Sequence, residues 1–128
     1  MKKYLILISL ILTLVSGVSF AEERFVDEFN GAGYYAEVDN ITLSGDYLVT
    51  NVTVKKPFYN KFILETVRFN MKENTYELLK QEIYQYNPRE FVESRKVFGA
   101  PLPLTDGSPY KAVMEFVLSW QKMTEYDI

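Results

Sequence analysis

The stretch Ser108-Pro-Tyr-Lys-Ala-Val-Met-Glu-Phe-Val-Leu-Ser-Trp-Gln-Lys-Met-Thr124 decides the fold class of this 128-residue chain. Its apolar residues recur about every 3.6 positions, which is typical of an amphipathic α-helix. Ser108 is a suitable N-cap, and Pro109 has no helical donor to lose at the first position. So wide an apolar face must be covered, and we expect Phe116 and Trp120 to be its main contacts with the rest of the domain.

The residues before this helix read as a series of strands. Apolar and polar side chains alternate, β-branched and aromatic residues are frequent, and Gly, Asn, Asp or Pro separate the segments. The predicted strands are residues 34–38, 47–55, 62–71, 75–86 and 91–98. We expect residues 22–33 to be a short, poorly ordered lead-in to the domain.

Two positions complicate the strand prediction. Residues 77–82 are good helix formers, so a helix competes with the strand at 75–86. The hairpin spacing and the Tyr84-Gln85-Tyr86 ending favour the strand. In the segment 62–71, Glu65 interrupts an otherwise apolar face, and we therefore expect that face to be only partly buried.

These elements predict one α+β domain over residues 22–128. Strands come first and a single helix comes last, so the helix has only the sheet to cover. We predict an antiparallel β-sheet of about five to six strands with one C-terminal α-helix packed on one face.

Residues 1–21 have the layout of a secretory signal peptide. Lys2 and Lys3 precede an apolar run that is shorter than the roughly 20 residues of a membrane-spanning helix. Ser19 and Ala21 supply small residues at the −3 and −1 positions of a cleavage point after Ala21. We therefore predict export, with the mature protein in the periplasm or at the cell surface.

Composition excludes several kinds of chemistry. The chain has no cysteine and no histidine, which rules out disulfides, thiolate metal sites and His-dependent catalysis within it. Its net charge is −3, and loss of the two leader lysines would make it −5. A negative domain has no general attraction for phosphate backbones or anionic lipid, so nucleic acid is not an expected partner.

The remaining catalytic options are weak. Carboxylate pairs are the main one, and neighbouring candidates are Glu77, Glu82, Glu90 and Glu93. Residues 39–46 contain side chains with oxygen ligands, but these side chains do not follow the order of ligands in an EF-hand calcium-binding loop. We predict no enzyme activity, no metal and no cofactor.

Aromatic residues make up 16% of the chain and include ten tyrosines. In a regular strand over 75–86, Tyr76, Tyr84 and Tyr86 share one face. Tyrosine is rigid and amphipathic and is enriched in binding surfaces, so these three residues are the candidate partner-binding site. The alternative is that the tyrosines pack in the core or at its edge.

The chain resembles the surface-adhesin E family of small exported bacterial proteins. The resemblance is carried by the leader, Tyr35 followed by Asp39 and Ile41, the strands 47–54 and 62–71, Thr75-Tyr76, and Pro103 and Gly107-Ser108 before the helix. It implies an antiparallel sheet with a C-terminal helix, envelope location, homodimer formation and binding to host extracellular matrix proteins. Family members tie the helix to the sheet with a cysteine pair, which this chain lacks.

These observations lead to one expected function and one alternative. We expect an exported bacterial surface or envelope protein that binds a host matrix protein or another macromolecular partner and catalyses nothing. The alternative is a periplasmic accessory or structural protein that binds an envelope component.

Overall fold

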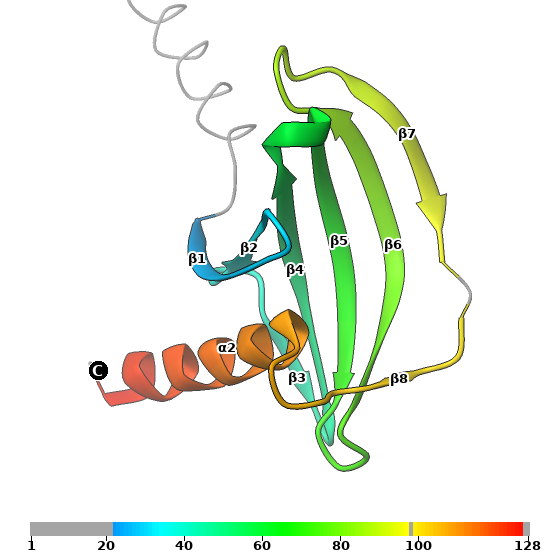
Figure 1. Cartoon of the computed structure of the whole chain (residues 1–128). Coiled ribbons are helices and arrows are strands. Elements are labelled where there is room, and N and C mark those ends of the chain that lie inside the picture. The colour runs from blue at the N-terminus through cyan, green and yellow to red at the C-terminus, as the bar shows by residue number, and fades with distance from the viewer. Residues whose placement is uncertain (1–21, 98, 127–128) are drawn as a thin grey trace, which may run out of the picture.

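The computed structural model describes residues 22–97 and 99–126 (Figure 1). The predicted signal peptide and its cleavage point after Ala21 lie outside the described residues. No helix in the described part of the chain is long and apolar enough to cross a membrane.

The described chain forms one antiparallel sheet followed by one C-terminal helix, so the predicted α+β fold is confirmed. The strands are β1 (Glu23–Phe29), β2 (Ala32–Glu37), β3 (Thr42–Ser44), β4 (Tyr47–Lys56), β5 (Lys61–Asn70), β6 (Thr75–Gln85), β7 (Phe91–Lys96) and β8 (Leu102–Pro103). A short 3₁₀ turn, η1 (Pro57–Tyr59), follows β4, and the helix is α2 (Pro109–Tyr126). The segment that could have been helix or strand is the strand β6.

The sheet order is β1-β2-β4-β5-β6-β7, with β3 on the edge of β4 and β8 on the edge of β6. The three long strands β4, β5 and β6 run side by side as a meander (Figure 1). Asn60 and Asn74 make the connections, and both have positive φ angles, 52° and 57°. Asparagine tolerates this left-handed conformation better than most residues, so both turns follow from the local sequence.

The expectation of a poorly ordered lead-in at residues 22–33 is wrong. These residues form β1 and the start of β2, joined by Asn30 and Gly31 with φ angles of 51° and 78°. Two consecutive left-handed residues make the tight turn whose twist matches that of the adjoining strands. The Asn-Gly pair is the feature of the sequence from which this hairpin could have been predicted.

The face of the sheet that carries α2, here called the helix face, holds the main core. The predicted alternation of β4 is confirmed, because Leu48, Val52 and Val54 are buried there. In α2, Val113 and Val117 are fully buried against the sheet. The small side chains of β2 on this face, Ala32 and Ala36, belong to the same cluster and let the helix approach closely.

The helix lies beside the β1–β2 hairpin and runs across the direction of β4 and β5 (Figure 1). Phe116 and Trp120 are only half-buried and stack on each other with ring centroids 6.2 Å apart. The guanidinium of Arg24 in β1 lies 5.2 Å from the Trp120 ring. The deepest anchors of the helix are therefore its valines, and the larger aromatic residues close the edge of the interface.

We predict that Val117→Ala lowers the free energy of unfolding by about 2–3 kcal/mol, because it removes two buried methyl groups and leaves a cavity. Met123→Ala is the control, since Met123 lies on the same helix but is exposed. It should change stability by less than about 0.5 kcal/mol. Chemical denaturation of both variants measures the difference, and equal midpoints would contradict the assignment of Val117 as an anchor.

Candidate functional site

A bulge in β6 separates the three candidate tyrosines. Thr66 pairs with Lys80 but Val67 pairs with Leu78, so Leu79 is an extra residue in β6. One extra residue reverses which face the following side chains point to. The expectation that Tyr76, Tyr84 and Tyr86 share one face is therefore wrong.

Each of the three tyrosines has its own environment. Tyr76 lies on the helix face, where its ring stacks on that of Tyr110 at 4.5 Å. Tyr84 lies on the opposite face, here called the open face, and makes edge contacts with Phe62 and Phe91. Tyr86 follows the end of β6, where its backbone N–H donates to the carbonyl of Asn60. Of the three, only Tyr84 belongs to the site described next.

The open face carries a hollow of about 410 Å³, which we call the groove. It is lined by Glu23, Glu37, Thr53, Phe62, Leu64, Tyr84 and Arg89. Glu23 and Tyr84 border it together although three strands lie between β1 and β6. These strands would lie about 19 Å apart in a flat sheet, so the sheet curls around the groove.

The apolar part of the groove is built around Phe62. This side chain is only 4% exposed, even though it points away from the helix and the main core. The Arg89 guanidinium lies 3.8 Å from the centre of its ring, and Tyr84 packs against its edge. A cation over an aromatic face is attracted by the π-electrons, and the contact restrains both side chains. The groove is therefore preformed.

The charged wall of the groove contains one carboxylate without a basic partner. Glu23 pairs with Lys55 at 2.8 Å, whereas Glu37 forms no ion pair within residues 22–97 and 99–126. The Asn51 amide donates to the Glu37 carboxylate at 2.5 Å. Burial raises the pKa of Glu37, and the nearby acids Asp39 and Glu23 raise it further against the lowering effect of Asn51. Glu37 is therefore the natural counter-charge for an incoming cation.

A smaller polar hollow of about 120 Å³ adjoins the groove and shares Glu37, Thr53 and Leu64 with it. Here the Thr66 hydroxyl donates to the Asn51 side-chain oxygen at 3.1 Å. The chain of hydrogen bonds Thr66–Asn51–Glu37 crosses three strands and orients the carboxylate. The site thus combines an apolar pocket with a fixed row of polar groups.

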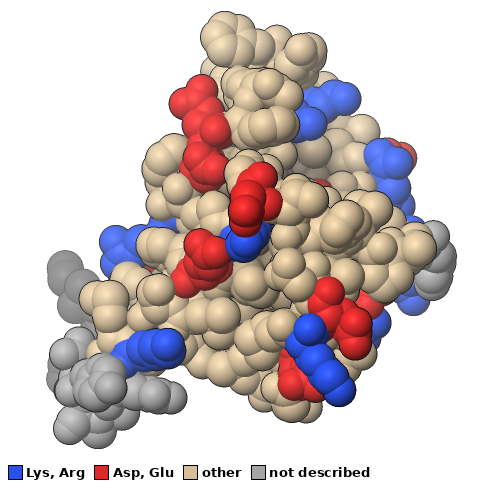
Figure 2. Space-filling view, turned by 60° about the horizontal axis from the view of Figure 1, so that its bottom comes forward, with Lys and Arg blue, Asp and Glu red and all other residues tan. Residues whose placement is uncertain are grey.

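Three of the four carboxylate candidates proposed from the sequence form ion pairs with basic residues. Glu77 pairs with Arg68, Glu82 with Lys80, and Glu93 with Arg95. Among the described residues, no three Asp or Glu side chains are grouped so that they could hold a metal ion. Figure 2 shows acidic and basic side chains interspersed over the face that it presents.

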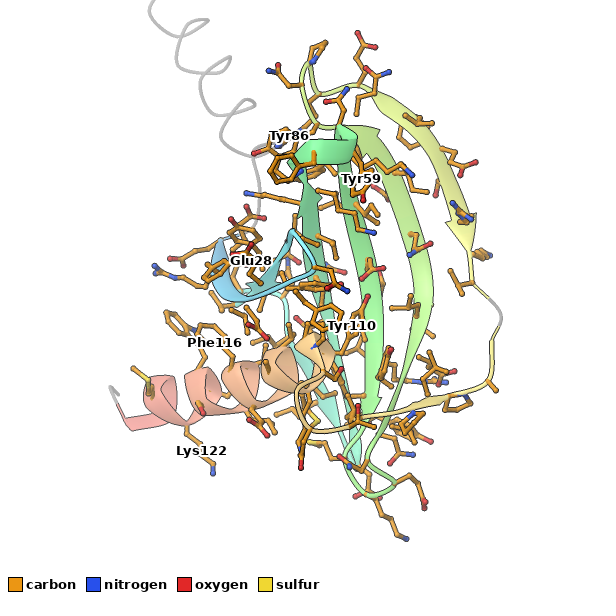
Figure 3. The ribbon with its side chains drawn as sticks, viewed as in Figure 1. Glu28, Tyr59, Tyr86, Tyr110, Phe116 and Lys122 are labelled. Atoms are coloured by element: carbon orange, nitrogen blue, oxygen red, sulfur yellow. The ribbon has the colours of Figure 1, made fainter. Side chains whose placement is uncertain are left out.

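Sequence reasoning missed a buried polar cluster on the helix face. Glu65 is only 3% exposed, so the expectation that it leaves its face partly buried is wrong. Its carboxylate accepts hydrogen bonds from the Tyr110 hydroxyl at 2.6 Å and the Gln81 amide at 2.7 Å. Tyr110 rises from the first turn of α2 toward the sheet (Figure 3), between the rings of Tyr34 and Tyr76.

This cluster joins α2 to β5 and β6. Burial raises the pKa of Glu65 above its ordinary value of 4.5, while the hydrogen bonds from Tyr110 and Gln81 oppose the shift. Burial, and then the charge of Glu65, raise the pKa of the Tyr110 hydroxyl. Tyr110 therefore remains protonated and acts as the donor. The sequence contained no usable signal, because Glu65 faces Gln81 only with the bulge in place, and a regular strand would place Lys80 opposite Glu65.

No protein-family model matches this chain, and the searches of curated proteins and of solved structures also found no match. The resemblance to the surface-adhesin E family therefore rests on the sequence pattern alone.

We predict that Glu65→Gln is more stable than the wild type at neutral pH, because it removes the buried charge. The new side-chain amide accepts from the Gln81 amide and donates to the Tyr110 hydroxyl oxygen, so no polar group is left unsatisfied. The pKa of Glu65 is raised in the folded state. The contribution of Glu65 to the free energy of unfolding is therefore greatest at low pH, and it falls as the pH rises through the folded-state pKa. The advantage of Glu65→Gln should therefore vanish in acid. Parallel curves of unfolding free energy against pH for the two proteins would contradict this.

The control variant is Glu65→Ala, which leaves the Tyr110 hydroxyl and the Gln81 amide without their acceptor. An unsatisfied buried group costs about 1–3 kcal/mol, so this variant should be destabilised at every pH.

Proposed function

We propose that the chain is an exported, adhesin-like binding protein that receives a segment of a protein partner in the groove. The observation that supports this proposal is the preformed pocket of Phe62, Leu64 and Tyr84. It lies beside the Glu37 carboxylate, which forms no ion pair with another described residue. Binding sites commonly combine an apolar cavity with a few fixed polar groups. The family resemblance and the predicted signal peptide support an envelope location.

The chemistry of the groove defines the partner segment. Its apolar wall favours an aliphatic or aromatic side chain, which would displace water from the exposed parts of Leu64 and Tyr84. Glu37 favours a lysine or arginine close to that side chain, because an incoming cation would neutralise the half-buried carboxylate. We therefore propose a basic and apolar surface segment of a host extracellular matrix protein as the ligand.

The second candidate is a periplasmic accessory or structural protein that uses the same groove for an envelope component. It rests on the same predicted export. Labelling of intact cells with antibodies against this protein separates the two candidates, because only an exposed protein is labelled before the envelope is opened.

We predict that Tyr84→Ser weakens binding to a purified matrix protein at least tenfold, because it removes one wall of the groove. The experiment measures binding of the mature protein to a panel of immobilised matrix proteins on a biosensor. Tyr86→Ser is the matched control, since it removes the same ring outside the groove. Equal losses in both variants, with unchanged melting curves, would contradict the proposed site.

We predict that binding weakens as the pH falls through the pKa of Glu37, because protonation removes the charge that attracts the basic group. Burial raises this pKa, so the loss should begin at a higher pH than for an exposed glutamate. Glu37→Gln should bind more weakly at neutral pH and show no such loss. Binding that strengthens in acid would contradict a cationic partner.

A further inference from the structure

The end of the sheet near η1 exposes large aromatic side chains to solvent. Phe58 is 91% exposed and Tyr59 is 72% exposed, and they follow each other in η1. Phe25 and Phe29 of β1 are also about half exposed, and a side chain at Gly31 would touch the Phe58 ring. We call Phe25, Phe29, Phe58 and Tyr59 the aromatic tip. Figure 3 shows Tyr59 and Tyr86 at this same end.

Two lysines lie on one side of the aromatic tip, beside Phe29 and Tyr59, and Glu28 lies on the other, beside Phe25 and Phe58. Lys56 and Lys61 are directly opposed across β4 and β5. Like charges in this position repel each other, and neither lysine forms an ion pair with another residue of the described chain. The charge of Lys56 lowers the pKa of the buried Glu65. The Glu65 carboxylate already accepts hydrogen bonds from Tyr110 and Gln81. The two ammonium groups therefore favour an external anion.

A hollow of about 410 Å³ opens between these lysines and the aromatic tip, and we call it the lysine hollow. Its lining includes Asn30, Tyr34, Lys56, Tyr59 and Lys61, which together offer hydroxyl, amide and ammonium donors. Phosphate oxygens accept hydrogen bonds from such groups, and lysine is a common phosphate ligand. The hollow thus suits a phosphate-sized anion at the base of an aromatic projection.

We propose that the aromatic tip docks on a lipid bilayer with anionic headgroups, with the lysine hollow holding a headgroup phosphate. Aromatic rings are favoured at the membrane interface, and nearby lysines add attraction to an anionic surface. The negative net charge opposes general adsorption, so docking requires this local cluster. A symmetric contact of this surface with that of a second copy is disfavoured, because it would bring Lys56 and Lys61 of both copies together.

This surface is separate from the groove. The groove lies on the open face of the sheet. In the lysine hollow, the strand residues Tyr34 and Lys56 lie on the helix-face side, as the strand register shows. The lysine hollow and the groove share no lining residue, so failure of one proposal does not decide the other.

The test is co-sedimentation of the mature protein with vesicles of equal parts phosphatidylglycerol and phosphatidylcholine, and with vesicles of phosphatidylcholine alone. We expect binding to the anionic vesicles only, and weakening by salt. The double variant Phe58→Ser, Tyr59→Ser should lose this binding. The double variant Lys56→Gln, Lys61→Gln should bind about 30-fold more weakly, at about 1 kcal/mol per lysine.

The matched control is the double variant Leu102→Ser, Met123→Ser, which removes exposed apolar side chains elsewhere and should bind like the wild type. Melting curves confirm that each variant is folded. Absence of wild-type binding, equal binding to both kinds of vesicle, or full binding by the Phe58 and Tyr59 variant would overturn the proposal. Displacement of the protein from vesicles by an equal charge of inorganic phosphate would also overturn it, in favour of a site for free phosphate.

Discussion

One extra residue in β6 controls how the two faces of the sheet are used. The bulge at Leu79 turns Tyr76 and Gln81 toward the helix, and it leaves Tyr84 on the open face. In a regular strand, Tyr76 and Tyr84 would point to the same face of the sheet. Either the helix interface would then lose Tyr76 or the groove would lose Tyr84. The core and the candidate site therefore both depend on this local change of register.

The helix is held to the sheet by packing and by one buried polar cluster. Val113 and Val117 supply the apolar contacts, and the Glu65 carboxylate fixes the first turn of α2 through Tyr110. Burying a carboxylate is unfavourable, and removing its partners would add to this cost because the buried acceptor would be left unsatisfied. Such a cluster favours one position of the helix over others that would bury a similar apolar area.

The two surfaces proposed for binding differ in chemistry and place. The groove is concave, and it is lined by the half-buried carboxylate of Glu37, which accepts a hydrogen bond from Asn51. The aromatic tip combines Phe58 and Tyr59, at the end of the β4–β5 hairpin, with Phe25 and Phe29 of β1, and Lys56 and Lys61 lie beside the hairpin end. A protein anchored by its tip would present the groove along its side, which is a workable arrangement for an envelope protein that captures a partner.

The sequence by itself determined the α+β class, the long strands and the C-terminal helix, because alternation and helical periodicity are local patterns. It also contained the Asn30-Gly31 turn, which explains the first hairpin. Only the tertiary structure decided that Leu79 bulges, that Glu65 is buried and that Tyr84 lines a groove. The physical reason is that strand register and burial depend on partners distant in the chain, and an alternating pattern cannot show where one residue is left unpaired.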